Sequence, residues 1–212
     1  MTGRTSITMQ VFEAVKERLL SGAFPSGARI DPNQIAQEHG VSPTPVRNAM
    51  NRLVGAGYVL SKPNDGFYAP ALTEKGLREL YECSALMLAS ALSGAPTRHK
   101  PHNPIDKING QTPKEFISYT ESLFLYVLAL RRNQTFCVLF TSVNMRLRPA
   151  RFAEAALISG IEAEINKIRL AYNSAKNDEL AQRIGAYHRR RMRYVARIVE
   201  KVSCNDAEPA IS

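Results

Sequence analysis

The sequence contains few cysteines and no long apolar run, and both absences exclude classes of protein. Its three cysteines, Cys83, Cys137 and Cys204, lie far apart and form no Cys-x-x-Cys pair. That pattern excludes a disulfide scaffold and a cysteine-based zinc or redox motif, and it fits a reducing cytoplasm. The longest apolar stretch, residues 123–130, has eight residues, far fewer than the ~18 that cross a bilayer. Because residues 1–10 also lack the apolar core of a secretory signal, we expect a cytoplasmic protein with no membrane partner.

The common catalytic motifs are also missing. The sequence has no Gly-rich phosphate loop, no Gly-x-Ser-x-Gly and no His-Glu-x-x-His. Loose combinations of Ser, His and Asp can be drawn from any chain, and none here has supporting spacing. We therefore expect a protein that is not an enzyme.

Positive charge is what the chain has in excess. Its 28 lysines and arginines outnumber its 19 aspartates and glutamates, which gives a formal net charge of +9. A surplus of this size suggests a polyanionic partner without naming it. Residues 1–72 hold 7 of the basic and 5 of the acidic side chains, so most of the surplus lies later in the chain. If the first third binds DNA, it does so with a few well-placed cations.

Length and periodicity predict two domains in a mainly α-helical chain. At 212 residues the chain fits one large domain or two small ones. We expect a DNA-binding domain over residues 1–72 and an all-α effector-binding or dimerisation domain over residues 73–212. The stretch 93–112, which holds several prolines and glycines, reads as an unusually long loop.

The first third has the pattern of a winged helix–turn–helix. Apolar residues recur at helical spacing in the first segment. Asp31 followed by Pro32 is a strong start for a second helix, and Gly40 is a suitable end for it. The predicted elements are helices at Thr8–Leu20, from Asp31 to Gly40 and from Ser42, then strands at Tyr58–Leu60 and Phe67–Ala69 joined by the turn Pro63–Gly66.

The third of these helices carries the clearest functional signal. At 100° per residue, one side is apolar and the other is polar and free of acid. Such a polar stripe can hydrogen-bond to base edges and phosphates, although an ordinary solvated helix face would look the same by itself. The helix order and the hairpin favour DNA binding. The predicted DNA-binding residues are Asn33, Ser42, Thr44, Arg47, Asn48, Asn51, Arg52, Lys62, Asn64 and Gly66.

About the first 80 residues resemble the GntR family of regulators. The resemblance rests on Val11–Gly22 followed by Pro25-Ser26-Gly27, on Ile35–Ser42, on Thr44–Leu53 and on Gly57-Tyr58-Val59. It implies a homodimeric bacterial transcription factor that reads a short palindromic operator in double-stranded DNA. Two positions depart from the family pattern. Pro43 stands where the family usually has arginine, and Asp65 stands at the wing tip where a basic residue is common, so each departure removes a contact to DNA.

After Thr73 the sequence pattern predicts only helices, and their succession predicts an antiparallel bundle. The expected helices follow apolar stripes at Leu77–Leu88, after a capping box at Thr112, at Phe136–Arg148, at Leu157–Tyr172 and at Leu180–Val202. The run Leu77–Glu82, the pair Arg132-Asn133 and the Arg-rich final helix resemble the FCD effector domain of the FadR branch of the GntR family. Where that domain has two long helices, this chain has one helix and the 93–112 stretch.

The FCD resemblance implies a divalent metal held by one Asp and three His. The matching positions in this sequence are Thr120, Phe124, Ile165 and His188. One imidazole cannot supply the converging ligands that such an ion needs, so we predict no metal and no cofactor. The same four residues are the predicted effector-binding residues. His188 lies on an apolar stripe, either as a core histidine with satisfied hydrogen bonds or as a group that binds an effector carboxylate or hydroxyl.

Two functional interpretations follow from these patterns. The first is a transcriptional regulator, specifically a repressor released by a small acidic metabolite. The second is a DNA-binding dimer whose helical domain serves only dimerisation or protein interaction and binds no metabolite. The basic cluster Arg189–Arg191, with Arg193 and Arg197, is interpreted as a solvated or acid-paired face rather than a second DNA site.

Overall fold

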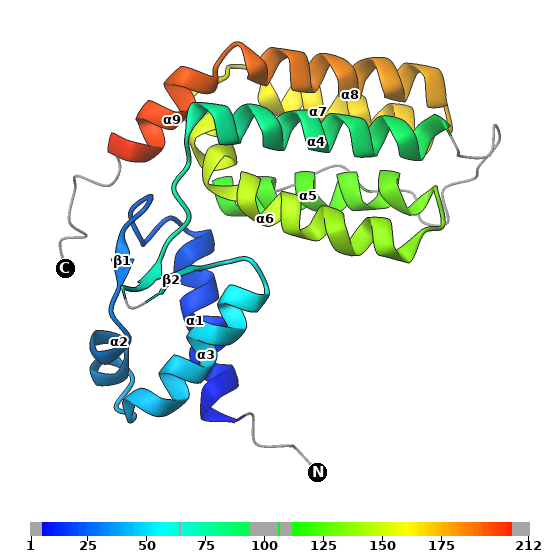
Figure 1. Ribbon diagram of the computed structural model, residues 1–212. Helices are drawn as coiled ribbons and strands as arrows, with labels where there is room; N and C mark the ends of the chain where they lie inside the picture. The colour runs from blue at the N-terminus through cyan, green and yellow to red at the C-terminus, as the bar shows by residue number, and fades with distance from the viewer. Residues whose placement is uncertain (1–5, 64, 94–105, 107–111, 205–212) are drawn as a thin grey trace. The chain divides into compact units, whose positions relative to one another are not determined.

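The computed structural model describes residues 6–63, 65–93, 106 and 112–204 (Figure 1). The chain divides into two compact units. The first comprises the described residues up to Leu72 and those from Val202 onward, and the second comprises Thr73–Lys201. The elements of the first unit are α1 (Ile7–Leu20), β1 (Arg29–Ile30), α2 (Pro32–Glu38), α3 (Pro43–Gly55), β2 (Leu60–Lys62) and β3 (Gly66–Tyr68). Those that follow are α4 (Glu74–Ser93), α5 (Pro113–Ala129), α6 (Gln134–Leu157), α7 (Ile161–Asn173), α8 (Asn177–Met192) and α9 (Val195–Cys204).

The first unit is a three-helix domain with a small antiparallel sheet. The strand order is β1-β3-β2, and Phe67 of β3 pairs with Ile30 on one side and Ser61 on the other. The predicted hairpin is present, but its first strand begins at Leu60, two residues later than expected. Strand β1 was not predicted, because two residues are too few to show an alternating pattern.

Capping residues and apolar spacing in the sequence determine where the helices of this domain begin and how they pack. The Asp31 carboxylate accepts a hydrogen bond from the backbone N–H of Asn33 at 2.8 Å and so caps α2. Helix α3 packs against α1 and α2. Its predicted apolar side is the buried one, and the core of the domain comprises Val11, Val15, Ile30, Ile35, Ala36, Val46, Ala49, Met50, Leu53, Val59, Phe67 and Ala69.

The second unit is a helical bundle. Helix α4 packs against α5, α6 and α8, while α5 packs on α6 and α7 on α8 (Figure 1). The predicted capping box at the start of α5 is confirmed, since the Thr112 hydroxyl accepts from the Glu115 N–H and the Glu115 carboxylate accepts from the Thr112 N–H. Aromatic and aliphatic side chains from α4, α5, α6, α7 and α8 form one continuous core.

Two expectations for the C-terminal helices are wrong. The single helix expected at Leu180–Val202 is two helices, because α8 ends at Met192 and α9 begins at Val195. Ala181, which lies at helical spacing on the same predicted apolar stripe as His188, is exposed. The buried face of α8 instead comprises Leu180, Ile184, Tyr187, His188 and Arg191. An amphipathic tyrosine and a charged arginine are buried here, and a stripe counted only from aliphatic residues misses both.

Most of the 93–112 stretch lies outside the described residues. Asp106 is described, and its carbonyl accepts a hydrogen bond from the Tyr119 hydroxyl at 2.7 Å. In the described part of the chain, no helix is both long and apolar enough to span a membrane.

Candidate functional site

Helix α3 separates a buried apolar side from an exposed polar one. Val46, Ala49, Met50 and Leu53 are fully buried. The opposite side exposes Thr44, Arg47, Asn48, Asn51 and Arg52.

The two arginines of that exposed side are available to a ligand. Among the residues that the structure describes, Arg47 and Arg52 make no ion pair and no side-chain hydrogen bond. An arginine with no internal partner keeps all of its guanidinium donors for a phosphate or for the edge of a guanine.

The residues that precede α3 add two small polar groups. Asn33 is exposed in the first turn of α2. Ser42 is the N-cap residue of α3, but its hydroxyl makes no capping hydrogen bond. That hydroxyl and the backbone N–H groups at the helix N-terminus beside it can donate hydrogen bonds to a phosphate oxygen.

The β2–β3 wing holds the remaining predicted contacts. The Lys62 ammonium lies 4.1 Å from the centroid of the Tyr68 ring, a cation–π contact that orients the lysine at the wing. Gly66 has φ 109°, a backbone conformation that side chains disfavour. Asn64 lies outside the described residues. Asp65 is exposed, so the wing presents a negative charge near Lys62.

Arg29 is a basic residue at the wing that the sequence argument missed. It is exposed on β1. A Cβ placed on Gly66 would lie 3.5 Å from the Arg29 Nε, so the guanidinium reaches across the sheet to the wing. The signal in the sequence was weak, because the pairing of β1 with β3 that brings them together is visible only in the fold.

Comparison with known proteins identifies this domain. The family of bacterial regulatory proteins called gntR matches residues 7–69. The winged helix is a GntR-family DNA-binding domain. Together with the relatives described next, this match shows that the chain is a DNA-binding transcriptional regulator.

Two relatives and one solved structure extend the comparison. The Nta operon transcriptional regulator of Aminobacter aminovorans is 28% identical over 140 residues, which are 62% of this chain and 67% of that protein. A protein of Paenarthrobacter nicotinovorans named a probable D-xylose utilization operon transcriptional repressor is 33% identical over 100 residues, 47% of this chain and 42% of the relative. A crystal structure assigned as a GntR transcriptional regulator from Rhodococcus sp. RHA1 has a TM-score of 0.75 at 19% identity and covers 91% of this chain and 98% of its own.

These matches differ in what they show. The structural likeness confirms the predicted fold class, a winged helix–turn–helix followed by a helical bundle. This regulator spans about two thirds of one curated relative and less than half of the other.

In the helical domain, His188 is a fully engaged core residue. Its Nδ1–H donates to the Ile184 carbonyl at 2.8 Å, and its Nε2 accepts from the Ser84 hydroxyl at 2.9 Å. The Phe124 ring stacks on the imidazole with centroids 6.1 Å apart. Burial lowers the pKa of His188 to about 4, so the ring is neutral at neutral pH. This geometry favours the core interpretation over the effector one.

Thr120 and Ile165 lie beside a different feature of the bundle. Both line a small cavity of about 10 Å³, together with Arg151, Glu154 and Arg191. The Thr120 hydroxyl donates to the Phe116 carbonyl at 2.9 Å. The four predicted effector residues therefore do not form one site. Thr120 and Ile165 line the cavity, whereas Phe124 and His188 stack on each other and are not part of its lining. A cavity of this size holds about one water molecule.

A buried ion network fills the centre of the bundle. Arg191 is fully buried; its Nε donates to the Glu154 carboxylate at 2.7 Å and its Nη1 to Glu164 at 2.8 Å. The Tyr81 hydroxyl donates to the second oxygen of Glu154. Burial alone would lower the pKa of Arg191, but the Tyr187 phenol and the two carboxylates outweigh it and raise that pKa. Arg191 is thus permanently charged in the core. It is acid-paired, as one of the two predicted alternatives has it, but it is buried and lies on no exposed face.

We expect metal removal to leave this regulator unchanged. In the described part of the chain, no cluster of three or more His, Cys, Asp or Glu side chains could hold a metal ion. His188 also has both ring nitrogens occupied. Mass spectrometry should find less than one equivalent of zinc, nickel or manganese, and a chelator should leave the melting temperature unchanged. Stoichiometric metal that disappears in His188→Ala would contradict this prediction.

Proposed function

We propose that the chain is a cytoplasmic homodimeric repressor that binds a palindromic operator in double-stranded DNA and has no catalytic activity. The observation that carries the proposal is the exposed side of α3, which is free of acid and holds two arginines without internal partners. The sign of regulation is supported by the name of the repressor from P. nicotinovorans.

Dimerisation follows from the shape of the target. Two recognition helices that enter successive major-groove faces must lie about 34–36 Å apart, and a two-fold dimer presents them to a palindrome. The helical domain offers apolar surface for such contacts, because Leu86 on α4 and Val138 and Leu139 on α6 are more than half exposed. Exposed apolar residues of this kind mark protein interfaces when they are contiguous.

The direct test is selection of DNA fragments by the full chain, followed by measurement of the mass of the complex. We expect the enriched sequence to be an inverted repeat and the complex to contain two chains. Enrichment of a single half-site by a monomer would contradict the dimer, and absence of any enriched sequence would contradict operator recognition.

We further propose that a small acidic metabolite controls DNA binding through the helical domain. A ligand can release DNA only if it binds one arrangement of the protein better than another. The second candidate, a helical domain that serves only dimerisation or protein interaction, is favoured by one observation: the cavity inside the bundle is about 10 Å³ and admits no metabolite as it stands. Thermal-shift measurements with organic acids separate the two, because a ligand that binds only the folded state stabilises it.

The charge at the wing tip gives a separate prediction. Asp65→Lys should strengthen binding to all DNA sequences and steepen the salt dependence, because one added phosphate contact changes the slope of log K against log [salt] by about 0.9. The control Asp65→Asn removes the negative charge without adding a cation, so the slope should stay as in the parent. Fluorescence anisotropy across a salt series measures both. An unchanged slope in Asp65→Lys would show that the wing tip does not approach the DNA backbone.

A further inference from the structure

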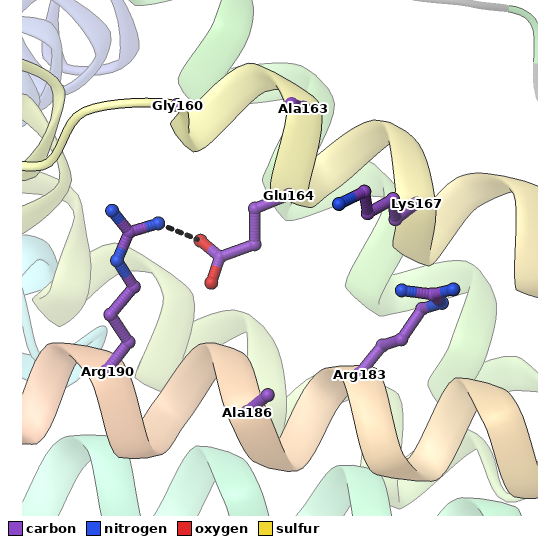
Figure 2. Close-up of a pocket in the computed structure, with 7 residues that line it drawn as sticks. All are labelled: Gly160, Ala163, Glu164, Lys167, Arg183, Ala186 and Arg190. Carbon is purple, nitrogen blue, oxygen red and sulfur yellow. Dashed lines mark ion pairs between the residues drawn. The ribbon is translucent and has the colours of Figure 1, made fainter.

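A solvent-open cleft between α7 and α8 is separate from the cavity inside the bundle. Its volume is about 250 Å³. Figure 2 shows that Lys167 and Arg183 lie at one end of the cleft and Arg190 at the other, and that the Glu164 carboxylate lies between them and is directed toward Arg190. Ala163 and Ala186 face the middle of the cleft, and Gly160 lies at the Arg190 end.

The sequence builds this cleft by helical spacing on both walls. On α7 and its cap, positions 160, 163, 164 and 167 share one face, and on α8, positions 183, 186 and 190 do the same. Ala163 and Ala186 are small residues in the middle of the two faces, so the helices leave room there beside the Glu164 side chain. The charged residues at the ends of the α8 face are seven positions apart, which is roughly 10 Å along the helix axis.

The cleft has more positive than negative charge available to a ligand, once the ion-pair partners of its side chains are considered. The Glu164 carboxylate is neutralised from the core side by Arg191, at 2.8 Å, and lies 3.8 Å from Arg190. Arg183 is paired with Glu179 outside the lining. Within the residues described, Lys167 has no ion-pair partner. The cleft therefore presents cations at both ends that its own carboxylate does not balance.

We propose that this cleft binds a small dicarboxylate, with one carboxylate on Arg190 and the other on Lys167 and Arg183. Arginine and carboxylate form charge-assisted hydrogen bonds, and two cationic ends select a molecule with two anionic groups. The inference rests on the proposed control by an acidic metabolite and gives that metabolite a chemical class and a site. Because the α7–α8 site is open to solvent, it does not need the closed interior of the bundle to expand.

The cleft is physically connected to the buried ion network. A single oxygen of Glu164, Oε2, lies near both Arg190 in the cleft and Arg191 in the core. A ligand carboxylate on Arg190 competes with Glu164 for that guanidinium. Glu164 is then left to Arg191, which also binds Glu154 between α6 and α8. Ligand binding on the surface can thus shift the interactions that hold α6, α7 and α8 together.

The test is calorimetric titration of the full chain with succinate and with glutarate, using acetate and inorganic phosphate as probes with one charged group. We expect saturable binding of a dicarboxylate and at least tenfold weaker binding of acetate and phosphate. Lys167→Ala and Arg190→Ala should each weaken dicarboxylate binding at least tenfold. Arg189→Ala is the matched control, because Arg189 is exposed on the same helix but does not line the cleft, and it should bind as the parent does.

A steric variant separates a site from general attraction to a basic surface. Ala163→Phe keeps every charge and fills the middle of the cleft from an exposed position, so it should abolish binding without unfolding the protein. Retained binding in Ala163→Phe, equal binding of acetate, or no binding of either dicarboxylate would overturn the site. Operator affinity with and without dicarboxylate is measured separately. Binding that the variants abolish, with operator affinity unchanged, would uphold the site and contradict metabolite control through it.

Discussion

Arg191→Ala is expected to destabilise the helical domain by about 3–5 kcal/mol, because it leaves the buried Glu154 carboxylate without the cation that it binds. The Glu154 side chain is 1% exposed. In the variant, the Tyr81 hydroxyl is the hydrogen-bond partner from this network that the Glu154 carboxylate keeps. The Arg191 guanidinium also lies 3.2 Å from the centroid of the Tyr187 ring, and that packing is lost as well. The measurement is chemical denaturation followed by helical circular dichroism.

The control for this prediction is the neighbouring arginine. Arg189 is exposed, so Arg189→Ala should change the free energy of unfolding by at most about 0.5 kcal/mol. The double variant Arg191→Met with Glu154→Leu should lose less stability than the two single changes added together, because it removes both buried charges at once. Strictly additive losses would mean that the two side chains do not act as a pair.

Features set by local sequence were predictable. The two sides of α3 follow from the spacing of Val46, Met50 and Leu53, and the cap of α5 follows from Thr112 and Glu115. In each case every deciding residue is within four positions of the next one along the chain. The fold class followed from the order of such elements.

Features set by pairing between distant segments were not predictable. Arg191 looks like one of several surface arginines in the sequence, and only the arrival of Glu154 and Glu164 from other helices makes its burial tolerable. The break between α8 and α9 is hidden because apolar residues continue at helical spacing through it. The α7–α8 cleft was equally unpredictable from the sequence, since a small residue on a helix face lines a cleft only if a second helix packs opposite it.

Arg47→Ala is expected to weaken operator binding by about 1–3 kcal/mol and to relax specificity at one operator position. Arg47 lies on the exposed side of α3, and in the described part of the chain nothing pairs with its guanidinium. Val46 and Met50 beside it are fully buried, so the helix is held in place from the other side and the truncation should leave the fold intact. Binding is measured by anisotropy on the selected operator and on operators with single base changes.

Arg52→Ala separates base reading from phosphate contact on the same helix. Arg52 is predicted to contact a phosphate, so its loss should weaken binding to all operators equally and lower the salt slope by about 1. Lys75→Ala is the control for a lost cation elsewhere, because Lys75 is 87% exposed on α4, and it should leave both quantities unchanged. If Arg47→Ala also weakens all operators equally, Arg47 contacts a phosphate and specificity must come from Asn48, Asn51 or Thr44. If neither arginine matters, α3 is not the helix that enters the major groove.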